Sequence, residues 1–262
     1  MGKITDALKK AAAERLSRLE RLDKTTEVKY EFIAKKTVDS SIDPRIVTFY
    51  DQQSPVTEQY RTLRTNIQAL SGSKPIKTIT ITSSTHSEGK TITAINLAIS
   101  MARDLDKKSI LLVDADMRRA RISKYLGVKS EIGLADLIAN GTQIDDALLN
   151  IGIDNLTLLP AGKIPQNPAE LLGSAKLKNL MSVLRSKYDY VIFDTPPIIP
   201  VTDAGLLGAQ TDGTIMVIQA NHTQKGVVKH AELTLKQAQA KLLGYILTNI
   251  QYHIPAYIYR YL

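Results

Sequence analysis

The feature that most constrains the fold is an alternation of short apolar runs with longer segments of helical character. The runs are rich in β-branched residues, which is typical of strands. They lie at residues 77–82, 109–113, 156–159, 190–193, 214–218 and 244–248. Strands that alternate with helices indicate a parallel sheet with helices on both faces. The sequence therefore predicts an α/β fold with a mostly parallel central sheet.

The N-terminal part departs from this alternation. Residues 3–23 contain no Gly or Pro, and Ile4, Leu8 and similar residues recur at helical spacing opposite Lys and Arg, which predicts an amphipathic helix. That helix either packs on the body of the protein or docks on a partner or a membrane surface. Residues 24–53 are polar and weakly periodic, so we expect a linker or extended arm there. A second helix is expected at 56–70.

Composition excludes several classes of protein. The chain of 262 residues has no Cys, so disulfides and thiolate metal sites are ruled out. No apolar run reaches the length of about 18 residues that predicts a transmembrane helix, and there is no apolar secretion signal. The net charge of +8 favours anionic partners. Without a helix-turn-helix or zinc pattern, we do not expect nucleic acid to be one of them.

The stretch TSSTHSEGKT at 82–91 has the form of a phosphate-binding loop between a strand and a helix. Lys90 would neutralise nucleotide phosphates, Thr91 would ligate Mg²⁺, and the helix N-terminus would add partial positive charge. Ser84 and Ser87 stand where glycine would ease the backbone. The alternative is a serine-rich turn without a ligand. The residues expected around the phosphates are Thr85, His86, Ser87, Glu88, Gly89, Lys90 and Thr91.

Two other apolar runs end in carboxylates. Asp114 and Asp116 follow the run at 109–113, and Asp194 ends YDYVIFD. Carboxylates at the exit of a buried strand are costly unless they hold a metal or transfer protons. The alternatives are a helix cap with a salt bridge to Arg118 or Arg119, and a strand-to-turn Asp-x-Pro. Because ligands bind at the carboxyl ends of parallel strands, the three motifs together predict a Mg-nucleotide site.

These motifs resemble those of the bacterial tyrosine kinases of capsule and exopolysaccharide gene clusters. The resemblance covers roughly residues 50–262, and it departs from the family at His86 and Ser87, where Pro-Gly is usual. The matching stretches are SSTHSEGKT at 83–91, DADMR at 114–118, PAGKIPQNPAELL at 160–172, DTPP at 194–197, and the Glu58, Arg61 and Arg64 pattern of an oligomerisation helix.

This resemblance implies an ATP- and Mg²⁺-dependent tyrosine autokinase that regulates polysaccharide polymerisation and export. Asp116 and Asp194 would hold the metal with Thr91, and Asp114 would orient or deprotonate the acceptor. The acceptors would be the clustered tail tyrosines Tyr252, Tyr257, Tyr259 and Tyr261.

The family also implies a larger assembly. It would be a homo-oligomeric ring, an octamer, joined through Glu58, Arg61 and Arg64. A membrane chain-length regulator would activate the kinase, and a protein-tyrosine phosphatase would reverse the reaction. We expect a cytoplasmic protein that a partner recruits to the inner face of the membrane. The expected regions are 1–53 (helix and linker), 54–251 (kinase domain) and 252–262 (tail).

Two alternatives remain open. A ParA/MinD-like partitioning ATPase shares the loop, but its signature lysine is replaced here by Thr85. The other alternative is a degenerate scaffold that binds nucleotide without turnover. The residues that turnover would need are all intact, which argues against it: Lys90, Asp114, Asp116 and Asp194.

Overall fold

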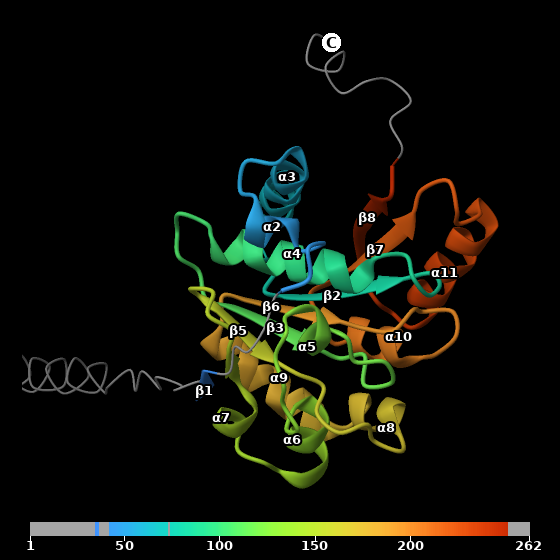
Figure 1. Ribbon diagram of the computed structural model, residues 1–262. Coiled ribbons are helices and arrows are strands. Elements are labelled where there is room, and N and C mark those ends of the chain that lie inside the picture. Colours follow the sequence, from blue (N-terminus) through green and yellow to red (C-terminus); the bar gives the residue numbers. More distant parts are fainter. Residues whose placement is uncertain (1–34, 37–41, 73, 251–262) are drawn as a thin grey trace, which may run out of the picture. The chain divides into compact units, whose positions relative to one another are not determined.

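The computed structural model describes residues 35–36, 42–72 and 74–250 (Figure 1). All the described residues belong to one compact unit, residues 34–262. The helix expected at 3–23 and the tyrosine-rich tail at 252–262 lie outside the described residues.

An eight-stranded sheet forms the centre of this unit, with the order β1-β4-β5-β3-β6-β2-β7-β8. All neighbouring strands are parallel except β4 and β5, which confirms the predicted mostly parallel α/β fold. Every expected strand is present, whereas the two-residue strands β1 and β4 were not predicted. The strands are β1 (Lys35–Lys36), β2 (Thr78–Ser83), β3 (Ile110–Asp114), β4 (Leu149–Asn150), β5 (Leu156–Leu159), β6 (Tyr190–Asp194), β7 (Gly213–Gln219) and β8 (Leu242–Thr248).

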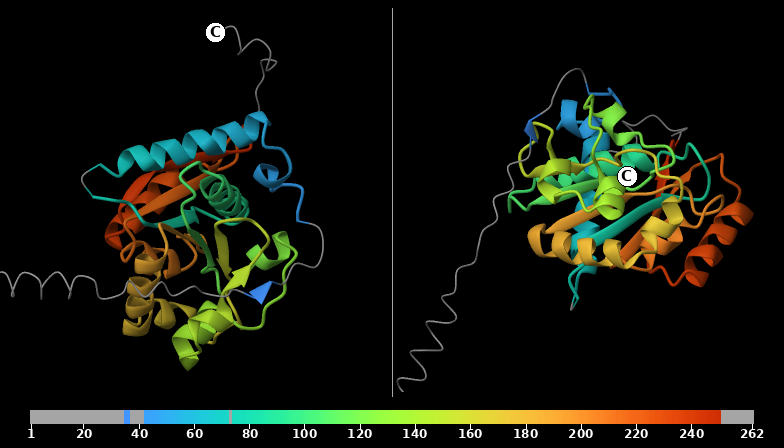
Figure 2. Two further views of the ribbon diagram at one scale, coloured as in Figure 1. Left: turned by 90° about the vertical axis from the view of Figure 1, so that its left-hand side faces the viewer. Right: turned by 90° about the horizontal axis from the view of Figure 1, so that it is seen from below.

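Helices cover both faces of the sheet, with α2, α3 and α4 on one side and α9 and α10 on the other (Figures 1 and 2). None of the helices in the described part of the chain is long and apolar enough to cross a bilayer. The helices are α2 (Val47–Tyr50), α3 (Pro55–Leu70), α4 (Lys90–Ala102), α5 (Ile122–Tyr125), α6 (Leu134–Asn140), α7 (Ile144–Ala147), α8 (Pro168–Leu172), α9 (Ala175–Lys187), α10 (Asp203–Gly208) and α11 (Lys225–Gln237).

The alternation of side chains along β7 shows how one strand serves both layers. Ile215 and Val217 belong to the large core that contains α4, and Met216 and Ile218 belong to a smaller core with residues of α10 and α11. Successive side chains of a strand point to opposite faces, so a strand between two helical layers must be apolar throughout. This explains why the strands read as continuous apolar runs.

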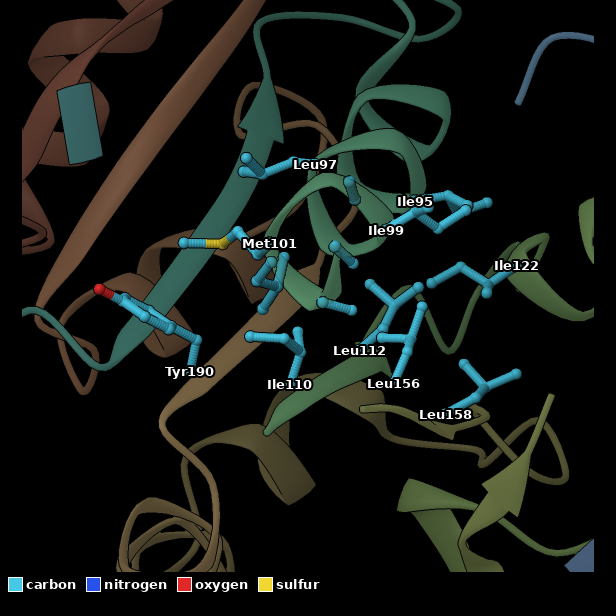
Figure 3. Packing of buried hydrophobic residues seen from close by; sticks show 14 of the residues in the cluster. Ile95, Leu97, Ile99, Met101, Ile110, Leu112, Ile122, Leu156, Leu158 and Tyr190 are labelled. Carbon is cyan, nitrogen blue, oxygen red and sulfur yellow. The ribbon is translucent and has the colours of Figure 1, made fainter. Parts of the chain in front are cut away.

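Helix α4 is the most deeply buried helix that carries site residues, with every residue from 93 to 102 buried. It lies between α3 and the sheet, so it is apolar on more than one side. Figure 3 shows Ile99 and Met101 of α4 beside Ile110 and Leu112 of β3 and Tyr190 of β6. The phosphate loop is therefore followed by a helix that is held firmly on the sheet.

The linker or extended arm expected at 24–53 is wrong for residues 42–53, whereas residues 35–36 form the short extended strand β1. Residues 42–53 include α2, and Ile42 and Ile46 are buried in the main core. The N–H and hydroxyl groups of Thr48 both donate to Asn96 Oδ1 of α4, at 3.0 and 2.9 Å. The helix in this segment has only four residues, which is too short to show a helical period, so its packing could not be predicted. The division of the chain at 53/54 and 251/252 stays a prediction.

Candidate active site

The three predicted motifs meet at one edge of the sheet. Strands β3, β6 and β2 are neighbours in this order, and all three are parallel. Their register pairs Asp114 with Asp194, and Asp194 with Ile81 of β2. The carboxyl ends of the strands therefore bring together the loop after β2, Asp114 and Asp116 after β3, and Asp194 at the end of β6.

Lys90 is the cation at the centre of this site. Its Nζ lies 2.9 Å from Asp116 Oδ2 and 3.7 Å from Asp194 Oδ1. Burial by itself would lower the pKa of Lys90, but the carboxylates of Asp194 and Asp116 outweigh it and raise that pKa. Lys90 is therefore held as an ammonium ion where phosphate charge would be neutralised.

Thr91 and Asp194 form a second contact from the loop to β6. The Thr91 hydroxyl donates to Asp194 Oδ2 at 2.7 Å. Asp194 is 1% exposed, and its Oδ1 has no hydrogen-bond partner in the described part of the protein. Burial raises the pKa of Asp194 above its ordinary value. This buried oxygen has the Lys90 ammonium 3.7 Å away but accepts no hydrogen bond, so it is free to coordinate a metal ion.

Only one carboxylate oxygen of Asp114 accepts hydrogen bonds from the described residues. Its Oδ2 accepts from the N–H groups of Arg121 and Ile122, at 3.1 and 3.0 Å, where α5 begins. Its buried Oδ1 has no hydrogen-bond partner among the described residues. Burial, and then the nearby Asp194, raises the pKa of Asp114 well above the usual range for a carboxyl group. Asp114 thus combines the expected capping contact with an unused oxygen of high proton affinity.

The oxygens at this site fit Mg²⁺ in kind and number. The Thr91 hydroxyl and the carboxylates of Asp116 and Asp194 are hard oxygen donors, which Mg²⁺ prefers. No group of three or more His, Cys, Asp or Glu residues forms a complete metal cage in the described parts of the chain. Mg²⁺ at nucleotide sites is usually held by one or two carboxylates together with phosphate oxygens and water. The arrangement therefore suits a metal that is bound together with a nucleotide.

Only one of the two serines that stand where glycine was expected, Ser87, has the backbone conformation that favours glycine. Ser87 has a φ of 65° and Gly89 a φ of 95°, both in the left-handed region. Ser84 has no positive φ and is fully buried, so its backbone does not require glycine. The expectation that glycine would ease the backbone holds for Ser87 and is wrong for Ser84. His86 and Ser87 are exposed at the tip of the loop.

Two features at this edge were not predicted. Arg118 donates to the fully buried Asp203 at the start of α10, through Nε at 2.8 Å and Nη2 at 3.0 Å. The alternative salt bridge from Arg118 to Asp114 or Asp116 is therefore not formed. Glu88 turns its carboxylate inward, where it accepts from the Thr85 N–H at 2.7 Å. No sequence signal connects Arg118 with Asp203, because the two residues are far apart in the chain.

The expected oligomerisation residues lie on α3, away from the carboxylates. Glu58 and Arg61 form an exposed ion pair at 2.8 Å. Arg64 instead points to α4, where Nη1 donates to the Ser100 carbonyl at 2.8 Å. The tail tyrosines predicted as acceptors lie outside the described residues.

Comparison with known proteins agrees with this site. The model of the AAA domain family AAA_31 matches residues 76–246. The chain is 37% identical over 215 residues to the tyrosine-protein kinase YwqD of Bacillus subtilis. The aligned region covers 82% of this chain and 90% of YwqD. This chain belongs to the bacterial tyrosine-protein kinases. The resemblance inferred from its motifs is confirmed.

Solved structures extend the comparison to the fold. The chimerical protein CapA2B2 matches with a TM-score of 0.76 and 30% identity, over 84% of this chain and 95% of that one. The kinase domain of the Escherichia coli tyrosine kinase ETK matches with a TM-score of 0.77 and 26% identity, over 84% and 85%. MinD of Pyrococcus horikoshii, solved with Mg-ADP, matches with a TM-score of 0.57 and 25% identity, over 70% and 75%. The fold and these neighbours imply nucleotide binding.

Proposed function

We propose that this chain is an ATP- and Mg²⁺-dependent autokinase. It phosphorylates the tail tyrosines of another copy and thereby regulates the polymerisation and export of a capsule or exopolysaccharide. The observation that carries the proposal is the meeting of Lys90, Thr91, Asp116 and Asp194 at one edge, with a carboxylate oxygen of Asp194 left without a donor. The acceptors are Tyr252, Tyr257, Tyr259 and Tyr261.

Positioning and charge neutralisation supply most of the catalysis in phosphoryl transfer. Lys90 and the N–H groups of the loop hold the ATP phosphates, and Thr91, Asp116 and Asp194 hold Mg²⁺ directly or through water. Bound Mg²⁺ supplies neutralisation of the charge on the phosphates. The Thr85 N–H already donates to Glu88, so the loop amides that bind phosphate are those after Thr85.

Asp114 is the residue that orients or deprotonates the acceptor tyrosine. A free tyrosine has a pKa of about 10, so the transfer needs a nearby proton acceptor. The unused Oδ1 of Asp114 is a carboxylate oxygen that can accept a hydrogen bond or the proton of the acceptor hydroxyl. Asp114 acts from β3, beside the Asp194 that holds the metal on β6.

The same proposal includes an assembly. Copies of the chain form a ring, an octamer, through α3, where Glu58 and Arg61 are exposed and available to a neighbour. Arg64 already holds α3 on α4, so it supports this surface from within. A membrane chain-length regulator recruits the kinase to the inner face of the membrane and activates it. A protein-tyrosine phosphatase removes the phosphates, whose charge weakens packed contacts of the tail.

The test is peptide mass spectrometry after incubation with ATP and Mg²⁺, with and without the cytoplasmic segment of the activator. Lys90→Met is the inactive variant, and Lys229→Met, an exposed lysine on α11, is its control. We expect phosphate on the tail tyrosines of the wild type and of Lys229→Met, and none on Lys90→Met. ATP hydrolysis without phosphotyrosine, even with the activator segment, would instead support the MinD-like ATPase to which the fold is also similar.

A further inference from the structure

Glu88 is a charged residue of the phosphate loop that is almost completely buried, with 1% of its surface exposed. Its Oε2 accepts from the Thr85 N–H at 2.7 Å, and its Oε1 accepts from the hydroxyl of Thr223. Its carbonyl oxygen accepts from the Thr248 hydroxyl at 2.7 Å. One residue of the loop thus contacts the loop itself, the connection between β7 and α11, and the end of β8.

This burial is informative because a carboxylate is expensive to remove from water unless donors satisfy it. Both carboxylate oxygens of Glu88 have donors, and both donors come from neutral groups of the protein. A carboxylate would also repel nucleotide phosphates. The side chain of Glu88 is therefore used to hold the loop and is not a ligand of the nucleotide.

The backbone around Glu88 needs such a hold. The residues on either side, Ser87 and Gly89, both have left-handed φ values, of 65° and 95°. For the serine this conformation is unfavourable, and it persists only where the surroundings enforce it. The fit at the end of β8 is also close, since a Cβ on Gly89 would lie 3.3 Å from Cγ2 of Thr248.

We propose that Glu88 is a positioning residue that clamps the phosphate loop to Thr223 and Thr248. The clamp keeps the loop N–H groups directed at the phosphates before the nucleotide arrives. Without the clamp, the strained turn at residues 87–89 relaxes, and nucleotide binding must then also order the loop, which weakens the affinity. This inference rests on the nucleotide binding in the proposed function, and it deepens that function by assigning what sets the affinity of the loop.

The experiment measures the Kd of a fluorescent ADP analogue with Mg²⁺, using the full chain. Glu88→Ala and Thr223→Val each remove one partner of the side-chain contact, and the bond from the Thr248 hydroxyl to the Glu88 carbonyl remains in both variants. Glu88→Gln is the conservative variant, because its amide can accept from Thr85 N–H and donate to the Thr223 hydroxyl. Thr234→Val is the matched control, since it deletes a hydroxyl from α11 that bonds only within the helix. Amide hydrogen exchange of residues 84–91 and thermal unfolding are recorded for each variant.

We expect Glu88→Ala to raise the Kd roughly tenfold to a hundredfold, because a charged acceptor with two donors is lost. Thr223→Val should raise the Kd less, and the double variant no more than Glu88→Ala, since both act on one contact. Exchange of the loop amides should become faster without nucleotide. Glu88→Gln should recover most of the affinity, and Thr234→Val should match the wild type.

Wild-type affinity and unchanged loop exchange in Glu88→Ala would overturn the proposal. A Glu88→Gln variant that binds the ADP analogue as weakly as Glu88→Ala would also overturn it, because the charge of Glu88 and not its hydrogen bonds would then set the affinity. None of these readouts depends on phosphate transfer. If the wild type binds nucleotide but forms no phosphotyrosine, the autokinase proposal fails and the clamp is still tested. If the wild type binds no nucleotide, loop exchange alone decides whether the clamp exists.

Discussion

The two ends of the central strands differ in how their carboxylates are bonded: Asp212 at one end is half-buried and has several donors, whereas Asp114 and Asp194 at the other end are fully buried and have few. At the amino end of β2, Asp212 Oδ2 accepts from the N–H groups of Lys77 and Thr78 at 2.9 and 2.8 Å, and Asp212 pairs with Arg185 at 2.7 Å. At the carboxyl end, Asp114 and Asp194 each keep an oxygen without a hydrogen-bond partner among the described residues.

The pKa values follow this difference. Burial alone would raise the pKa of Asp212, but the hydrogen bonds from Arg185, Thr78 and Lys77 lower it below its ordinary value. Burial raises the pKa of Asp114 and Asp194 because too few donors oppose it. One residue type therefore stabilises the fold at one edge of the sheet and serves a ligand site at the other.

The largest expected effect is that of Asp194→Asn. Phosphotyrosine formation should fall at least about a hundredfold, because a metal-holding carboxylate is lost where charge must be neutralised. The free energy of unfolding should stay within about 1 kcal/mol of the wild type, since the folded protein does not favour the ionised form of this side chain. Kinase assays and urea denaturation measure the two effects. An Asp194→Asn variant that loses stability and keeps its activity would contradict the assignment of Asp194 to a ligand site.

Asp212→Asn should have the reverse effect. We expect a loss of about 1–3 kcal/mol in the free energy of unfolding, because Arg185 and two backbone N–H groups lose a charged acceptor. Phosphotyrosine formation per folded molecule should be unchanged. Asp189→Asn, at a second carboxylate that accepts from the backbone N–H and the hydroxyl of Ser109, is a suitable control for a generic acidic contact at this edge.

The pH dependence of Asp212 has a definite sign. Its pKa is lowered in the folded state, so its contribution to stability is fully present above the unfolded pKa of about 3.9 and is lost as the pH falls through the folded pKa. Urea denaturation from pH 6 to 3 should therefore show a steeper acid loss for the wild type than for Asp212→Asn. Parallel profiles would show that Asp212 is not the linked group.

A smaller effect should separate two arginines of α3. Arg64→Ala should cost about 1–2 kcal/mol of stability, because its guanidinium bonds Ser100 O and lies 3.6 Å from Asp104 Oδ1 in a mostly buried position. Arg61→Ala should cost no more than about 0.5 kcal/mol, because its ion pair with Glu58 is exposed. Denaturation of the two variants at equal concentration makes the comparison. Equal losses would contradict the inward role of Arg64.

The smallest expected effect concerns the two serines of the loop. Ser87→Gly should change stability by less than about 1 kcal/mol, since relief of the left-handed backbone offsets the added freedom of the unfolded chain. Ser84→Gly should destabilise by about 0.5–1 kcal/mol, because that serine is buried and has no positive φ to relieve. Thermal unfolding checks both. A more stable Ser84→Gly would restore the original expectation for that position.

Local pattern determined much of this protein. The strand expected at 156–159 coincides with β5, and the helix expected at 56–70 differs from α3 by one residue. Pro55 begins α3, and the Ser54 side chain accepts from the Thr57 N–H at 3.1 Å, which is local capping chemistry. Periodicity, caps and phosphate-loop motifs act over a few residues, so they can be read from the sequence.

The sequence also determined which side chains gather at the site, because parallel strands present their carboxyl ends at one edge. It did not determine their partners. That Lys90 contacts Asp116 and Asp194, and that Arg118 pairs with Asp203, depends on the strand order β3-β6-β2 and on where α10 begins.

Only the tertiary structure decided the roles of residues 42–53 and of Glu88. The segment is short and its apolar residues follow no regular period, yet Ile42 and Ile46 are buried because α4 and the core offer a surface for them. Glu88 looks like one more polar residue of a loop, and its role comes from Thr223 and Thr248, which are distant in sequence. Hydrogen-bond partners across such distances follow from packing of the whole sheet, and no local pattern encodes them.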